Sequence, residues 1–150
     1  MFYFIFLINE YRKEKKLPAI PLSKSLSYVA RQHVKDLDIN LKTMSHSWST
    51  CNYNPSDNKT FNCMWLKPSE LTNYKSYGYE CIFSISDGGA SAQEALNAWK
   101  KSINHNNVIL NKSIWKSMNW NALGVGIYKN YAAIWFGENL DDENTPQVCE

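Results

Sequence analysis

The feature that most constrains the fold is a pair of strand-like runs near the end of the chain. The segments ALGVGIY (122–128) and YAAIWFG (131–137) are rich in aliphatic and aromatic residues, and only Lys129 and Asn130 separate them. Two such runs about a two-residue turn are typical of a β-hairpin, although Lys-Asn is not a preferred turn pair. The segment YECIFSI (79–85) predicts one further strand. The expected strands therefore lie in the later half of the chain.

Three helices are expected from apolar periodicity and helix-end signals. The first covers residues 4–16 and ends at a Leu-Pro pair, because the residue before proline avoids the helical conformation. The second begins after Ser23, a suitable N-cap, and continues to about Leu37 with one apolar face. The third begins at a capping box of the S-x-x-E form that starts at Ser91, and it ends near Ser102.

The order of these elements indicates the fold class. Residues 43–78 read as irregular, with a short helical turn at 68–71. Helices gather early, strands gather late and no strict βαβ repeat occurs, which predicts an α+β fold or an α/β/α sandwich. The 150 residues contain no internal repeat or linker and fit one domain. Its core is expected over about 4–138, followed by an acidic C-terminal tail at 139–150.

Composition excludes several classes of partner. The 16 basic and 14 acidic side chains give a net charge of +2, which is too balanced for a nucleic-acid or anionic-membrane protein. The apolar start MFYFIFLI is far shorter than the roughly 20 residues that span a bilayer. It also lacks the basic region and cleavage site of a complete signal peptide, and an export signal upstream of it stays open. We expect no nucleic-acid partner, no transmembrane segment and a monomer.

Two of the four cysteines bracket a polar loop. Cys51 and Cys63 flank NYNPSDNKTFN, a segment rich in turn-forming residues, and we favour a disulfide bond between them. Such a bond persists in oxidising compartments and points to an exported protein. Cys81 and Cys149 have no local partner, so their roles stay open. The spacing of the cysteines fits neither a zinc ribbon nor a C-x-x-C redox motif.

The three histidines differ in their surroundings. His33 lies on the apolar face of the second helix, where a hydrogen-bonded core residue is expected. His46 belongs to SHSW in the irregular segment, and His105 belongs to SINHNNVIL, where the chain is expected to turn after the third helix. Two histidines and a carboxylate are an ordinary zinc-binding set. Nothing local pairs them, however, because the sequence has no HExxH motif and no histidines four residues apart.

Several short segments follow one another in an order shared by a known family. They are INEYR (8–12), which resembles an opening HNxxR helix; HS at 46–47, which resembles a loop histidine; GYEC (78–81), which resembles a GEN segment; AWKKSINHNNVILN (98–111), which is similar to the bacterial form W…SPGHRANILNP; and GVGIYKNYAAIWFG (124–137), which resembles a closing hairpin. Together they resemble the CAP superfamily of cysteine-rich secretory proteins, venom antigens and plant pathogenesis-related proteins, and its bacterial secreted branch above all. The resemblance spans about residues 4–138.

The resemblance implies a three-layer α/β/α sandwich with a central, mainly antiparallel sheet. It also implies a cleft with two histidines and two glutamates, of which His46, Glu80 and His105 match three. The second glutamate would fall near Ser102, and this sequence has no carboxylate there. Three ligands with water in the fourth position can hold zinc or another divalent metal. The expected cleft residues are His46, Glu80, His105, Ser47, Trp48 and Asn104.

Three functions are compatible with this resemblance. The first is a secreted, extracellular binding module for a host or other extracellular ligand, with lipids among the candidates. The second is a metal-dependent hydrolase in which Glu80 is the candidate general base. The third is a structural cell-envelope protein with a vestigial cleft. Without metal, His46 and His105 could hydrogen-bond to Glu80 and hold the 43–78 segment. The tryptophans expected in the core are Trp99, Trp115, Trp120 and Trp135.

Overall fold

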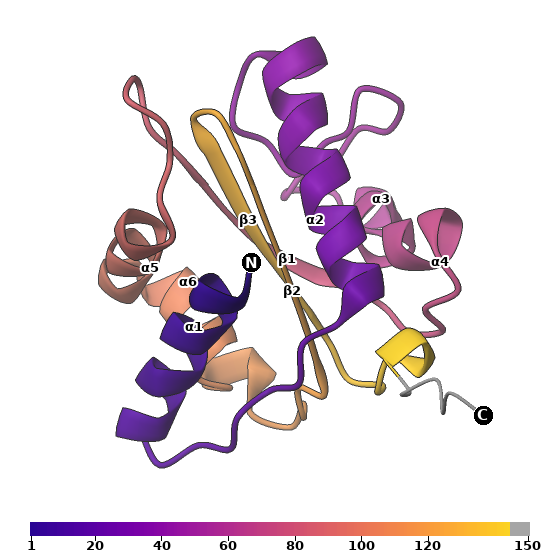
Figure 1. Ribbon diagram of the computed structural model, residues 1–150. Helices are drawn as coiled ribbons and strands as arrows, with labels where there is room; N and C mark the ends of the chain where they lie inside the picture. The colour runs from indigo at the N-terminus through magenta and orange to yellow at the C-terminus, as the bar shows by residue number, and fades with distance from the viewer. Residues whose placement is uncertain (145–150) are drawn as a thin grey trace, which may run out of the picture.

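An antiparallel sheet with helices on both faces forms the protein, as the computed structural model of residues 1–144 shows (Figure 1). The strands are β1 (Tyr79–Ser84), β2 (Ala122–Tyr128) and β3 (Tyr131–Gly137), in the order β1-β3-β2. Both neighbouring pairs are antiparallel. Because β1 pairs only with β3 in this order, it lies at an edge of the sheet. The predicted α/β/α sandwich is confirmed, with strands where the sequence predicted them.

The β2–β3 hairpin carries apolar side chains toward both helical layers. On β3, Ile134 and Phe136 pack into the core on one face, whereas Ala133 and Trp135 pack into the core on the other. Alternate residues of a strand point to opposite faces, and a sheet covered on both sides requires apolar residues at both. The unusual turn pair is accommodated because Lys129 adopts a left-handed conformation with φ of +48°.

Three helices cover one face of the sheet: α1 (Phe2–Glu14), α5 (Ala92–Lys101) and α6 (Ile103–Ile109). The predicted capping box is present, since the backbone N–H of Glu94 donates to Ser91 Oγ over 3.2 Å. The segment after α5 was expected to turn, but the chain enters α6 two residues later. Helix α6 places His105 in the lining of a cavity.

A buried arginine joins α1 to the segment that ends α6. Arg12 is 2% exposed and donates to the carbonyl oxygens of Pro18 over 3.0 Å and Ile109 over 2.6 Å, and to Asn111 Oδ1 over 2.8 Å. Burial lowers the pKa of the Arg12 guanidinium to about 10, so the side chain stays charged at neutral pH. Three acceptors thereby compensate the loss of water around a buried cation.

The opposite face is covered by α2 (Lys24–Asp36), with the short helices α3 (Asn62–Trp65) and α4 (Lys67–Leu71) beside it. The predicted N-cap is confirmed, because Leu26 N donates to Ser23 Oγ over 2.9 Å. Helix α2 packs directly on the backbone of β2. A Cβ added at Gly124 would lie only 2.1 Å from the carbonyl carbon of Leu26, so glycine is required for this approach.

The segment between α2 and β1 is more ordered than the sequence predicted. A π-helix (Leu37–Leu41) continues α2, and α3 precedes the expected turn, which forms α4. The predicted disulfide between Cys51 and Cys63 is present, with their Cα atoms 5.7 Å apart. Short 3-10 helices occupy Asn58–Thr60, Ser113–Trp115 and Asp142–Asn144.

The start of the expected acidic tail contacts the domain. Asp141 is buried, and its carboxylate accepts hydrogen bonds from the hydroxyls of Ser23 and Ser25 and from the backbone N–H of Ser25. This carboxylate thus lies at the N-terminal end of α2, where a negative charge is favourable. The part of the expected tail from residue 145 on, which includes Cys149, lies outside the described residues. Within residues 1–144, no helix is both long and apolar enough to cross a membrane.

Candidate functional site

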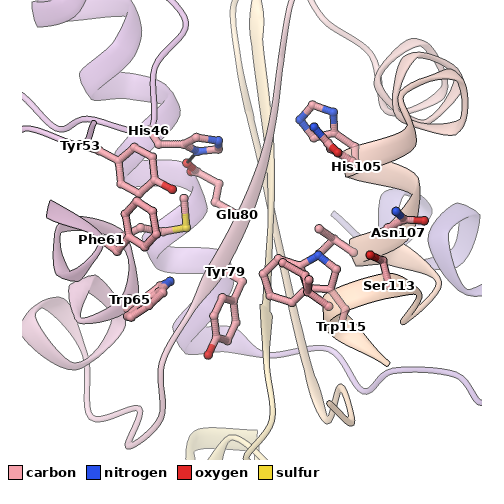
Figure 2. A pocket seen from close by; sticks show the side chains of 14 residues that line it. His46, Tyr53, Phe61, Trp65, Tyr79, Glu80, His105, Asn107, Ser113 and Trp115 are labelled. Carbon is pink, nitrogen blue, oxygen red and sulfur yellow. Dashed lines mark hydrogen bonds and ion pairs between the residues drawn. The ribbon is translucent and has the colours of Figure 1, made fainter. Parts of the chain in front are cut away.

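A cavity of about 490 Å³ surrounds the edge of the sheet at β1. Tyr79 and Glu80 follow each other on β1 and point to opposite faces of the sheet, yet both line this cavity. They can do so because β1 is an edge strand and the cavity extends around it. Figure 2 shows β1 between two walls, one formed by residues that follow α2 and the other by residues of α6 and the segment after it. The lining residues are His46, Tyr53, Phe61, Met64, Trp65, Tyr79, Glu80, Asn104, His105, Asn107, Val108, Ser113, Ile114 and Trp115.

Glu80 links two histidines on the α2 side of the sheet. Its Oε2 lies 2.5 Å from His33 Nδ1, and its Oε1 lies 2.9 Å from His46 Nδ1. The side chains of Glu80 and His33 are fully buried, whereas that of His46 is 30% exposed toward the cavity. We call this set of three residues the His33–Glu80–His46 clasp.

The partners of His33 determine its charge. Its Nδ1 faces a carboxylate oxygen and its Nε2 lies 2.9 Å from the carbonyl oxygen of Ser47. The carbonyl oxygen only accepts, and the carboxylate only accepts when it is ionised, as the lowered pKa of Glu80 indicates, so both ring nitrogens donate and the ring is an imidazolium. Trp48 stacks on this ring with 4.3 Å between the ring centroids, which favours a cation over its π face.

The pKa values of the clasp agree with this assignment. Burial alone would lower the pKa of His33, but the charge and hydrogen bond of Glu80 outweigh burial and raise it. Burial alone would raise the pKa of Glu80, but the charge and hydrogen bond of His33 and the bond from His46 lower it. The two groups therefore form a buried ion pair, and the positive charge compensates the carboxylate that lines the cavity.

His105 lies on the opposite wall and does not join the clasp. Its Nδ1 lies 2.7 Å from Ser102 Oγ, one turn earlier at the start of α6. Burial and the nearby charge of His46 both lower the pKa of His105, so its ring is neutral at pH 7. A hydrogen-bonded set of His46, Glu80 and His105 was one sequence-based alternative. In the structure, His33 and not His105 is the second histidine that contacts Glu80. The reason is that Glu80 points toward the α2 layer, whereas His105 comes from the α6 layer.

The structure places the expected cleft residues in two locations. His46, Glu80, His105 and Asn104 line the cavity. Ser47 and Trp48 do not belong to its walls, since Trp48 is buried behind the clasp against His33. Lys67 also lies over the ring of this buried tryptophan, with Nζ 5.0 Å from the ring centroid.

An aromatic lining is the part that sequence reasoning missed. Tyr53, Phe61, Trp65, Tyr79 and Trp115 form a chain of ring contacts, with successive centroids 5.2 Å, 5.4 Å, 6.2 Å and 5.2 Å apart. Trp115 was expected in the core but is half-buried and faces the cavity, as Figure 2 shows. No local motif marks these rings, because they come from separate segments that only the fold brings together.

The donor atoms of the expected metal ligands, His46, Glu80 and His105, are partly engaged by other protein groups. Both oxygens of Glu80 already accept from imidazole rings, and Nδ1 of His105 is engaged by Ser102. Among residues 1–144, no three His, Cys, Asp or Glu side chains form a group that could hold a metal ion. The side chains as arranged do not fit a three-ligand metal centre.

Comparison with known proteins agrees with this architecture. The chain is similar over 93% of its length to an extracellular SCP-domain protein of Bacillus anthracis, with a TM-score of 0.70 and 22% identity, and it covers 40% of that protein. It is similar over 90% of its length to an outer surface protein of Borrelia burgdorferi, with a TM-score of 0.65 and 18% identity, and it covers 89% of that protein. It is also similar over 92% of its length to a cysteine-rich secretory protein of Staphylococcus aureus, with a TM-score of 0.63 and 14% identity, and it covers 38% of that protein.

Sequence comparison supplies the family. No curated protein matches the chain in a sequence search. The model of the cysteine-rich secretory protein family, CAP, matches residues 5–133, which include β1, β2, the clasp and both walls of the cavity. The chain belongs to the CAP family.

Proposed function

We propose that this chain is a secreted binding module and that its ligand occupies the cavity at β1. The observation that carries the proposal is the cavity itself, since about 490 Å³ lies within the range of about 300–1,000 Å³ typical of small-molecule sites. Its lining combines several aromatic rings with a few polar groups, as such sites usually do. Export is supported by the Cys51–Cys63 disulfide and by the similarity to an extracellular protein of Bacillus anthracis and an outer surface protein of Borrelia burgdorferi.

The hydrolase alternative is less well supported. A general base needs a free lone pair and a pKa near the working pH. Glu80 does not meet the second condition, because the charge and hydrogen bond of His33 and the hydrogen bond from His46 outweigh burial and lower its pKa, and its side chain is fully buried between these rings. No step of hydrolysis can therefore be assigned to it. The vestigial-cleft alternative predicts no saturable ligand at all, which makes it separable by a binding experiment.

Binding of an uncharged fluorescent probe tests the proposal. N-phenyl-1-naphthylamine should bind with saturation near one equivalent, and the Trp115→Ala variant should weaken this binding. The matched control is Tyr28→Ala, which removes an aromatic ring that is 43% exposed on α2, away from the cavity lining. Absence of saturable binding to the parent protein, or equal affinity of both variants and the parent, would refute the proposal.

Zinc binding is a separate prediction and has a separate test. Calorimetric titration of the oxidised protein with zinc, alongside His46→Ala and His105→Ala, measures whether the two walls share a metal. Since the donor atoms as arranged do not fit a metal centre, the binding-module proposal requires no zinc. Saturable uptake near one equivalent that both variants lose would show that the cavity rearranges to hold one.

A further inference from the structure

The two walls of the cavity differ in chemistry. Tyr53, Phe61 and Trp65 present ring faces and edges on one side, and Figure 2 shows His105 and Asn107 on the other side of β1. Asn104 comes from the same helix, α6, and also lines the cavity. A ligand between these walls would therefore meet aromatic carbon on one side and, on the other, amide and imidazole groups beside the apolar side chains of Val108, Ile114 and Trp115.

The α6 wall carries two side-chain amides that have no hydrogen-bond partner among residues 1–144. In the described part of the chain, the side-chain amides of Asn104 and Asn107 make no hydrogen bond. Each can donate two hydrogen bonds and accept others. An apolar chain packed over them would remove their water without replacing its hydrogen bonds, which is unfavourable. These two amides disfavour a purely apolar ligand and favour one that also carries hydroxyl or amide groups.

Charge restricts the ligand further. The residues that line the cavity in the described part of the chain include no lysine or arginine. Glu80 is the lining carboxylate, and His33 compensates its charge from behind. A phosphate or sulfate group would find no cation to bind it, and an exposed carboxylate is not available to attract a cationic ligand. The cavity is suited to a neutral ligand.

We infer that the ligand class is a neutral saccharide of a few units. A pyranose ring offers C–H groups on its flat faces, which pack on aromatic rings, and hydroxyl groups around its edge, which bond to amides and imidazoles. The cavity provides both at once, with Tyr53 and Trp65 for the ring faces and Asn104 and Asn107 for the hydroxyls. This inference rests on the proposed function, because it assigns a ligand class to the same cavity.

Calorimetry with three probes tests the inference. N,N′,N″-Triacetylchitotriose supplies an N-acetylated saccharide, maltotriose supplies an unacetylated one, and laurate supplies an apolar chain. At least one trisaccharide should bind with saturation and should compete with N-phenyl-1-naphthylamine. The Asn107→Leu variant, which keeps the side-chain size and removes the amide, should weaken the trisaccharide about three- to tenfold and leave dye affinity equal or higher. Asn97→Leu makes the same change at an exposed position on α5, outside the lining, and should not alter saccharide binding.

The outcomes separate this inference from the proposed function. Saturable dye binding without competition by either trisaccharide would overturn the saccharide assignment and leave the binding-module proposal intact. Tighter binding of laurate than of both trisaccharides would also overturn it, as would a trisaccharide affinity that Asn107→Leu leaves unchanged in a variant with a native melting curve. Failure of the dye and of all three probes would refute the proposed function itself.

Discussion

Replacing Glu80 with glutamine tests the His33–Glu80–His46 clasp at its centre. Glu80→Gln keeps the shape of the side chain but removes the charge opposite the buried His33 ring, 2.5 Å away. The amide can still accept from His33 and can donate to His46 if that ring changes tautomer. Removing one partner of a buried ion pair costs about 3–5 kcal/mol, and the retained hydrogen bonds place this variant at the lower end, about 3 kcal/mol. For a chain of this size that corresponds to a Tm about 6–12 °C lower.

The pH dependence of this loss follows from the two shifted pKa values. Because the pKa of His33 is higher in the folded than in the unfolded protein, its protonation stabilises the fold. This stabilisation is complete below the pKa of the unfolded state, 6.5, and is lost as the pH rises through the pKa of the folded state. The lowered pKa of Glu80 stabilises the fold above its unfolded value of 4.5, and this stabilisation is lost as pH falls through the folded value. The difference between parent and variant should therefore be largest between these two unfolded values and should shrink at alkaline pH.

Urea unfolding of both proteins from pH 4 to pH 9 measures this difference. Glu10→Gln is the matched control, because its exposed carboxylate has its ion-pair partner Lys13 at 3.9 Å, and it should change stability little at any pH. A stability difference for Glu80→Gln that stays constant across the range would contradict the buried ion pair. It would mean that His33 is neutral in the folded protein.

Three further perturbations have defined expectations. Cys51→Ser opens a bond that spans 12 residues, and loop entropy predicts a loss of about 3 kcal/mol in the free energy of unfolding relative to the oxidised parent. Gly124→Ala places a Cβ 2.1 Å from the backbone of α2, so urea unfolding should show a loss of about 3 kcal/mol or more, and unchanged stability would refute the close approach. Asp141→Ala removes a buried carboxylate that lies at the start of α2, and thermal melting should show a loss of about 1–3 kcal/mol at pH 7. Because hydrogen bonds from Ser23 and Ser25 outweigh burial and lower the pKa of Asp141, that loss should shrink as pH falls below its unfolded value of 3.8.

Most of the fold could be predicted from the sequence because the signals that specify it are local. The hairpin, the Ser23 N-cap and the Ser91 capping box each occupy a few consecutive residues, and each forms as predicted. Helix α6 was missed because the Asn-rich segment that follows Ser102 is typical of a turn. Packing of its apolar end, through Val108 and Ile109, overrides that local preference.

The site was predicted less completely because its contacts are not local. Sequence order and family resemblance placed His46, Glu80 and His105 in one cleft, and all three line the cavity. The partnership of His33 with Glu80 depends on which face of β1 carries Glu80, and that is fixed by strand register. His33 was correctly predicted as a hydrogen-bonded core residue, but its role as the cation opposite Glu80 was visible only in the structure. The aromatic wall likewise depends on segments brought together by the fold.

The most direct test of the account is a nuclear magnetic resonance measurement of the three imidazole rings during titration with N-phenyl-1-naphthylamine. His46 and His105 line the cavity from opposite walls, whereas the side chain of His33 is fully buried behind Glu80. The ring signals of His46 and His105 should shift together with saturation, and those of His33 should stay nearly constant. Dye binding that leaves the rings of both His46 and His105 unchanged would contradict the claim that this cavity is the ligand site.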